Sequence, residues 1–137
     1  MYETMLYWET VPPAGLEPAP VRDFTEIWRG ADKIVFSRTL DAPRSARTRI
    51  ERSFDPGEIQ HLKATAGGDL TVGGANVAAQ AIESGLVDEF QLFAVPVVVG
   101  GGKPWLPGRL RLDLELLESR SFASGVVFLR YRTGTGQ

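Results

Sequence analysis

The stretch DLTVGGANVAAQAIESGLVDEF, residues 69–90, carries the clearest indication of the fold class. It starts with a short run, 69–73, whose apolar and β-branched residues are typical of a β-strand. The run passes through Gly73-Gly74 directly into an alanine-rich helical pattern over 75–84. A strand that hands over to a helix in this way predicts an α/β unit.

Upstream of this unit, helical and strand patterns alternate. Residues 1–10 can begin a helix, whereas 11–20 contains four prolines and one glycine and predicts a loop. The later segments are a short helix that starts near Pro20 and stops at Gly30, a strand at 33–37, a polar connection over 41–54 with a short strand near Ile50, and a helix that starts after Asp55 and ends at Gly67-Gly68.

Downstream, Gly85 is placed as the left-handed cap of the 75–84 helix, and 88–100 has a long strand pattern. Pro96 has no N–H, so it requires an edge, a bulge or the end of pairing at that point. The alternating runs 110–119 and 126–132 predict an antiparallel hairpin. The 137 residues therefore suit one domain, 1–137, of α/β class: helices on both faces of a mixed, mostly parallel sheet.

The glycines at 73 and 74 admit two interpretations. Either the tight turn needs glycine, or a ligand must approach the backbone closely. The first N–H groups of a helix have no partner within the helix, and its dipole is positive at that end, so a strand–Gly-Gly–helix can hold a phosphate or pyrophosphate. The pattern is neither a dinucleotide fingerprint nor a Walker motif, and spacing alone leaves both interpretations open.

Three polar residues, Ser37, Arg38 and Thr39, end the strand at 33–37. In α/β sheets ligands bind beyond the carboxyl ends of strands, so these residues and the Gly73-Gly74 turn are expected on one rim. Arg38 can hold a phosphate by a bidentate pair, and the two hydroxyls can add hydrogen bonds. A dinucleotide with an adenosine 2′-phosphate would use both clusters. The alternative is that Arg38 is a solvated residue at a strand end.

Composition excludes several kinds of protein. The formal charge is 15 − 17 = −2, which gives no electrostatic case for nucleic acid. There is no cysteine, hence no disulfide, thiolate metal site or cysteine nucleophile. A single histidine, His61, cannot make a metal cage. No apolar run is long enough to span a membrane, and the first ten residues do not resemble a signal peptide, so the cytoplasm is expected.

Other candidates favour structural roles. The glycine cluster before Lys103 is typical of a tight turn, and no helix pattern follows it. Asp88 and Glu89 are adjacent at a strand start, so they face opposite sides. No catalytic nucleophile, base or acid is identified.

The segments KIVFSRTL, DLTVGGANVAAQAIESGLVDEFQLFAVPVVVGGGKPWLP and LDLELLESRSFASGVVFLRYR resemble the dihydrofolate reductase-like proteins of the riboflavin deaminase-reductase C-terminal domain type. The resemblance covers nearly the whole chain, and the block over 70–106 is its specific part. It implies a dihydrofolate reductase-like three-layer sandwich and an NADPH-dependent reductase.

The resemblance also implies residue roles. Ser37, Arg38 and Thr39 match the family's adenosine-phosphate site, while Gly73, Gly74, Ala75, Asn76 and Val77 match its pyrophosphate site. The reference activity is that of a 5-amino-6-(5-phosphoribosylamino)uracil reductase, and other members resemble dihydrofolate reductase. The expected partners are a small-molecule substrate and, since homodimers are common in the family, a second copy of the chain.

One departure from the family pattern concerns the N-terminus. Family members begin with a strand, a segment like SLDG and a GR pair, and Met1 falls just after that point. The resemblance therefore implies a domain that lacks its N-terminal strand and helix, with exposed apolar faces that make it poorly stable or lead it to dimerise. The alternative function is a non-catalytic nucleotide-binding or dimerisation module, or a remnant of an enzyme.

Overall fold

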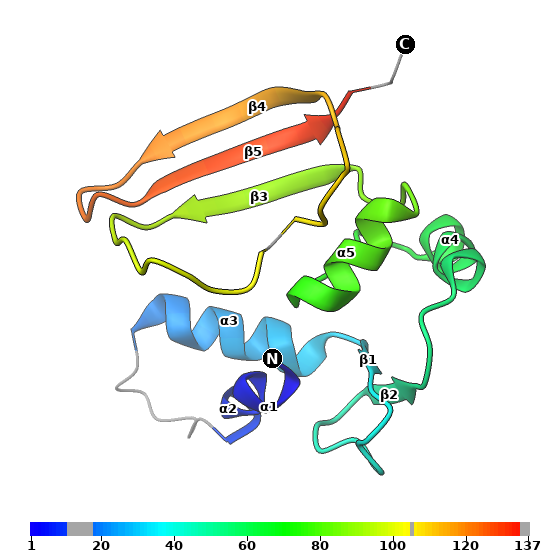
Figure 1. Ribbon diagram of the computed structural model, residues 1–137. Helices are drawn as coiled ribbons and strands as arrows, with labels where there is room; N and C mark the ends of the chain where they lie inside the picture. The colour runs from blue at the N-terminus through cyan, green and yellow to red at the C-terminus, as the bar shows by residue number, and fades with distance from the viewer. Residues whose placement is uncertain (11–17, 105, 135–137) are drawn as a thin grey trace. The chain divides into compact units, whose positions relative to one another are not determined.

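The computed structural model describes residues 1–10, 18–104 and 106–134 (Figure 1). Residues 11–17 of the loop expected over 11–20, and Trp105, lie outside these ranges, and residues 19 and 20 already belong to a helix. The chain divides into two compact units, Met1–Asp55 and Pro56–Gln137. Each unit is described by itself below.

The first unit contains three helices, at Tyr2–Met5 (α1), Tyr7–Thr10 (α2) and Ala19–Gly30 (α3). α3 ends at Gly30, as the sequence predicts. Side chains join α2 to α3: the Trp28 indole N–H donates to the Glu9 carboxylate at 3.0 Å. The Arg29 guanidinium donates to the carbonyls of Trp8 at 3.1 Å and Glu9 at 3.0 Å. These bonds fix the two helices to one another through the carbonyls at the end of α2.

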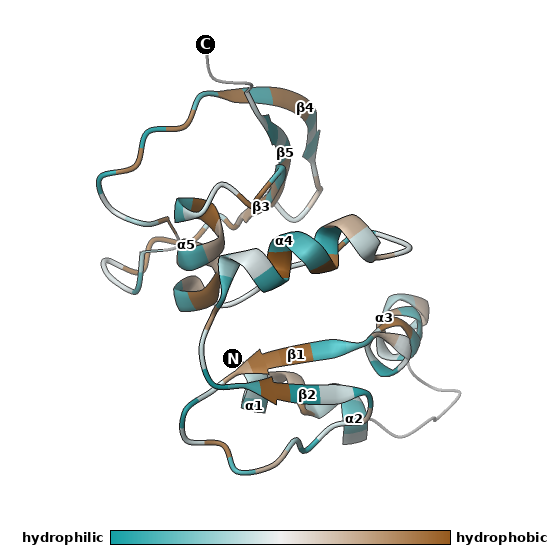
Figure 2. Cartoon of the chain, turned by 90° about the vertical axis from the view of Figure 1, so that its right-hand side faces the viewer, coloured by the Kyte–Doolittle hydropathy of each residue, from teal (hydrophilic) through white to brown (hydrophobic). Residues whose placement is uncertain are grey.

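The first unit also contains a parallel pair of strands, Lys33–Phe36 (β1) and Thr48–Glu51 (β2). β1 is mostly hydrophobic (Figure 2), which suits a strand that is half-buried along its length. β2 confirms the short strand expected near Ile50. The ladder places Lys33 opposite Thr48 and Phe36 opposite Glu51, so both strands run out at the same carboxyl edge. The residues after this edge include the Ser37–Thr39 cluster.

The second unit contains the helices Pro56–Thr65 (α4) and Ala75–Glu83 (α5). α5 ends in a Schellman motif, with Gly85 N–H bonded to the Ile82 carbonyl at 3.0 Å and Leu86 N–H bonded to the Ala81 carbonyl at 2.9 Å. Gly85 has φ of 67°, a left-handed conformation that glycine adopts without strain. The predicted cap at Gly85 is therefore confirmed.

The second unit also carries a three-stranded antiparallel sheet in the order β3-β5-β4. Its strands are Glu89–Ala94 (β3), Leu114–Ser121 (β4) and Val127–Thr133 (β5). β4 and β5 form the predicted C-terminal hairpin, and Figure 1 shows β5 in the middle of the sheet. The buried apolar residues of this unit lie on α5, just after it and on β3: Ala81, Ile82, Leu86 and Phe90.

The α/β class with both parallel and antiparallel pairing agrees with the prediction, but the strand expected over 69–73 is wrong. This segment pairs with no strand of the described residues, and the ladders form two sheets rather than one. Its side chains have a strand pattern, but a strand also needs a neighbour that exchanges backbone hydrogen bonds with it. Leu70 and Val72 remain 45% and 44% exposed.

The strand expected over 88–100 ends early, at Ala94. Pro96 explains the difference, because it offers no N–H to a ladder and marks the end of pairing. Val97 N–H then bonds locally to the Val95 carbonyl at 2.8 Å instead of to a strand. The following valines are left in solvent, with Val98 97% and Val99 81% exposed. This segment therefore leaves apolar side chains exposed in the second unit.

The glycines at 100 and 102 have φ of 69° and 145°, so the chain conformation itself requires glycine there, in agreement with the expected tight turn. Among the described residues, none of the helices has the length and apolar character needed to cross a bilayer.

Candidate functional site

The start of α5 is built from backbone groups. Gly74 is the N-cap, with φ of 93° and ψ of 122°, and no side chain caps the helix. The first helical bond runs from Ala78 N–H to the Gly74 carbonyl at 2.9 Å, so the N–H groups of Ala75, Asn76 and Val77 precede the first bonded turn. The first turn contains no acidic residue that would neutralise the helix dipole. An anion is the natural partner of such a helix end.

The backbone conformation requires glycine at one of the two positions of this turn and not at the other. Gly74 adopts a conformation that residues with a Cβ rarely enter, so the turn alone accounts for glycine at 74. Gly73 has no positive φ, and its conformation does not demand glycine. The tight turn therefore explains Gly74, while for Gly73 the close approach of a ligand to the backbone stays a prediction.

The helix before it provides a contrast. The first turn of α4 contains Glu58, whose carboxylate complements the positive end of the dipole. The Asn76 side chain on α5 does not cap its own helix; its amide oxygen accepts from Gln80 Nε2 at 2.8 Å, one turn along. Of α4 and α5, α5 is the helix whose first turn has no acidic residue.

The second predicted cluster lies at the carboxyl edge of β1 and β2. Ser37 N–H bonds to the Glu51 carbonyl at 3.0 Å and so prolongs the parallel ladder. The Ser37 hydroxyl oxygen accepts from Leu40 N–H at 3.1 Å and from Thr39 N–H at 3.4 Å, which closes a turn over 37–40. Arg38 and Thr39 project from this turn as exposed residues.

Arg38 differs from its neighbouring arginines in its ion pairs. Arg38 forms no ion pair with a carboxylate of the described residues, whereas Arg47 and Arg49 in the same unit are bound to Asp32 at 2.9 Å and Glu51 at 3.1 Å. An unpaired guanidinium beside a free hydroxyl can bind a phosphate oxygen pair. Ser37–Thr39 belong to the first unit and Gly73–Val77 to the second, and their meeting on one rim stays a prediction.

Sequence reasoning missed one residue at this edge. Arg52 directly follows β2, and its Nη1 donates to the carbonyls of Ser37 at 2.9 Å and Leu40 at 2.7 Å. The residue lies in a polar connection with no motif. The signal that could have found it is the parallel pairing of 33–36 with 48–51, which brings the residues after each strand together.

The paired acids Asp88 and Glu89 have structural partners. Lys63 on α4 donates to the Asp88 carboxylate at 2.6 Å and to the Leu86 carbonyl at 2.6 Å. Glu89 accepts from Arg130 Nε at 2.7 Å. This hydrogen bond is the main reason that the pKa of Glu89 lies below its ordinary value, and it raises the pKa of Arg130. No group of three or more potential metal-binding side chains comes together in the described parts of the chain.

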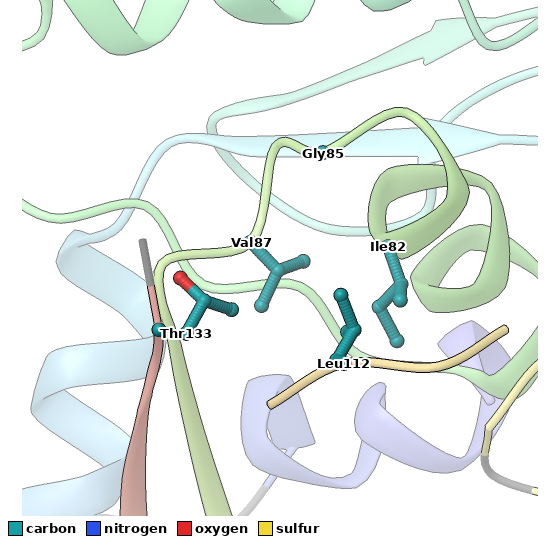
Figure 3. A pocket seen from close by; sticks show the side chains of 6 residues that line it. Ile82, Gly85, Val87, Leu112 and Thr133 are labelled. Carbon is teal, nitrogen blue, oxygen red and sulfur yellow. The ribbon is translucent and has the colours of Figure 1, made fainter. Parts of the chain in front are cut away.

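A pocket of about 220 Å³ lies at the opposite end of α5 (Figure 3). Its lining combines the end of α5, the segment before β3, the segment before β4 and the end of β5, and consists of Ile82, Gly85, Val87, Leu112, Thr133 and Gly134. The side chains shown are mainly aliphatic, and the Thr133 hydroxyl is engaged with the Asp88 carbonyl at 3.1 Å. The pocket offers no acid, base or cation, so it is not part of the candidate anion site.

Comparisons with known proteins agree with the fold. Residues 4–128 match the family model of the RibD C-terminal domain. The chain is 33% identical over 138 residues to the uncharacterized protein YyaP of Bacillus subtilis (strain 168), covering 94% of this chain and 73% of the relative.

Two solved structures share the architecture. A putative riboflavin biosynthesis protein from Shewanella sp. PV-4 superposes with a TM-score of 0.65 at 16% identity, over 94% of this chain and 88% of that one. A pyrimidine reductase-like protein from Corynebacterium diphtheriae gives a TM-score of 0.50 at 20% identity, over 88% of this chain and 48% of that one. These likenesses confirm the fold class predicted from the sequence.

Proposed function

The chain belongs to the RibD C-terminal domain family, and from this premise we propose that it is an NADPH-dependent reductase. The substrate is a small pyrimidine- or pterin-like molecule, in line with the pyrimidine reductase-like name of one structural relative. The observation that carries the proposal is the start of α5, where Gly73 and an uncapped, acid-free helix end form a seat for a pyrophosphate. A nucleotide-dependent reductase of this kind fits a cytoplasmic location.

The residues fit the cofactor in two places. The N–H groups of Ala75, Asn76 and Val77 suit the two phosphates shared by NADH and NADPH, because backbone donors and the helix dipole both favour negative charge. Arg38, with Ser37 and Thr39 beside it, suits the adenosine 2′-phosphate that only NADPH carries. Affinity for the dinucleotide and preference for its phosphorylated form are thus assigned to different elements.

The nicotinamide, when bound, supplies the hydride for a C=N or C=O group of the substrate. The chain's own contribution is to hold the cofactor at its phosphates, which fixes the position of the rest of the molecule. Binding energy at groups remote from the reacting atoms is used for orientation, so loss of a phosphate contact lowers turnover as well as affinity.

The test is a titration of the wild type and Arg38→Ala with NADPH and NADH, followed by fluorescence. We expect the wild type to bind NADPH more tightly than NADH. Arg38→Ala should weaken NADPH binding about 10- to 100-fold and change NADH binding little, since a charge-assisted hydrogen bond contributes about 1.5–3 kcal/mol. Arg44→Ala is the matched control, because Arg44 is exposed and precedes β2 at the other edge of the same ladder. Equal affinity of the wild type for both cofactors would contradict the assignment.

The exposed valines after β3 favour a second candidate function, a dimerisation module that binds nucleotide without catalysis. Val95 is 60%, Val97 65% and Val98 97% exposed, and apolar residues of this density are covered in many assemblies. A homodimer of the reductase would use the same surface. Sedimentation of the purified chain measures self-association, and NADPH oxidation with a candidate pyrimidine or pterin substrate separates the two functions: turnover rules out the non-catalytic module.

A further inference from the structure

Arg52, which lies outside the turn over 37–40 in sequence, is hydrogen-bonded to both ends of this turn. β1 and β2 are parallel and in register up to Phe36 and Glu51, so Arg52 emerges from the sheet beside the turn. Its Nη1 donates one hydrogen bond to the Ser37 carbonyl at 2.9 Å and one to the Leu40 carbonyl at 2.7 Å. One nitrogen therefore bridges the first and last residues of the turn and fixes the distance between them.

The two bonds use only part of the guanidinium. An arginine has five N–H donors, and the two on Nη1 are directed to the turn. The described residues offer no hydrogen-bond acceptor to the three donors on Nε and Nη2. The Nε–Nη2 edge is one that binds a carboxylate or phosphate in bidentate fashion. No ion pair joins this edge to the adjacent carboxylate of Glu51, which binds Arg49 Nε at 3.1 Å.

We propose that Arg52 is a second specificity residue of the anion site at this edge, which binds a phosphomonoester together with the Ser37–Thr39 turn. The inference rests on the proposed function, in which the phosphomonoester is the adenosine 2′-phosphate of NADPH. A phosphomonoester carries about 1.5 to 2 negative charges near neutral pH, and Arg52, bonded to the turn that contains Arg38, supplies a second positive charge. Arg52 thus both shapes the turn and offers its free edge to the ligand.

Two variants separate these roles. Arg52→Ala removes the bonds to the turn and the free edge together. Arg52→Lys keeps a cation whose ammonium can still donate to the carbonyls of Ser37 and Leu40, but lacks the planar edge that binds phosphate in bidentate fashion. Arg44→Ala is again the control, since Arg44 lies at the opposite edge of the β1–β2 ladder. Circular dichroism checks that all three variants are folded.

We expect Arg52→Ala to weaken NADPH binding at least about tenfold and NADH binding less than about twofold, with Arg44→Ala unchanged. Arg52→Lys should keep the wild-type fold and still lose most of the preference for NADPH. If Arg52→Lys restores the full preference, Arg52 acts only by shaping the turn and the proposed contact is wrong. An unaltered NADPH-to-NADH ratio in Arg52→Ala overturns the inference altogether.

A simpler probe distinguishes failure of this inference from failure of the proposed function. Adenosine 2′-monophosphate carries the phosphomonoester without the pyrophosphate or nicotinamide, and adenosine is its uncharged control. Binding of the monophosphate that depends on Arg52 supports the anion site even if neither dinucleotide binds, in which case the reductase proposal fails alone. Dinucleotide binding without any effect of Arg52 on either ligand leaves the reductase proposal standing and removes the role of Arg52.

Discussion

The two candidate phosphate sites are built in different ways. At the carboxyl edge of β1 and β2, the turn over 37–40 depends on side chains: the Ser37 hydroxyl closes it, and Arg52 bridges its ends. At the start of α5, the groups that face an anion are backbone N–H donors, and no side chain caps them. A site made of side chains can lose its preference for one ligand when a single side chain is removed. A site made of backbone N–H groups is weakened mainly when a substitution adds a side chain next to it.

The largest effect is expected from filling the space beside the backbone site. Gly73→Val places a branched side chain next to the free N–H groups of α5, at a position whose φ a non-glycine residue can adopt. We expect the binding of NADPH and that of NADH to weaken equally, by about a hundredfold, since more than one charge-assisted hydrogen bond is lost. This pattern differs from that of Arg38→Ala, which affects NADPH alone. Titration with both cofactors measures it.

Gly68→Val is the matched control for this substitution. Gly68 lies in the same α4–α5 connection, has no positive φ, and a Cβ there would meet no atom within 4 Å. It should bind both cofactors like the wild type. Wild-type affinity in Gly73→Val would show that the start of α5 does not bind the pyrophosphate. The turn over 37–40 would then be the one candidate phosphate site of the two that remains.

A smaller effect, on stability, is expected at the neighbouring glycine. Gly74→Ala forces a residue with a Cβ into φ of 93° and ψ of 122°, which should cost about 1–3 kcal/mol. Gly68→Ala, in an ordinary conformation, should be neutral or slightly stabilising. Urea unfolding followed by circular dichroism compares the two variants. Equal midpoints would mean that the turn does not require glycine at 74.

The sequence predicts those parts of the fold that depend on local chemistry. Gly30 ends α3 because glycine is a poor helix former, and Gly74 and Gly85 bound α5 because glycine can adopt their positive φ. Pro96 ends pairing after β3 because it has no N–H to donate. The alternating runs on either side of Gly125 predict the hairpin from their period of two and the short turn between them. Such signals need no knowledge of a distant partner.

Features that depend on which distant segments of the chain pair with one another could not be predicted from the sequence. The apolar pattern over 69–73 has no ladder, since a strand pattern does not specify the neighbour that a strand requires. The role of Arg52 depends on the register between two strands whose pairing the sequence does not state. Ser37, Arg38 and Thr39 could be named as candidates from their place after a strand, whereas the residue that holds their turn could not.

The arginines of the two units differ in their partners. In the sheet of the second unit, Arg130 is held by the Glu89 carboxylate at 2.7 Å, so its charge is balanced within the protein. In the first unit, Arg38 has no such partner among the described residues, and Arg52 is bonded to neutral carbonyls. A paired guanidinium serves the fold, and an unpaired one remains available to an anion. Arg130→Ala should therefore leave the cofactor preference unchanged.

The smallest predicted effect is the pH dependence of this paired arginine. The Arg130 hydrogen bond lowers the pKa of Glu89 in the folded chain, so the folded state favours the ionised carboxylate. A lowered pKa contributes stability above the pKa of the unfolded state, near 4.3 for glutamate, and that contribution is lost as pH falls through the folded value. Glu89→Gln should be less stable than the wild type at neutral pH, and the difference should shrink below about pH 4. Urea unfolding of both proteins across this pH range measures the difference in stability. Glu26→Gln, at an exposed position, is the control. A difference that does not change with pH would show that the pair contributes through packing and not through charge.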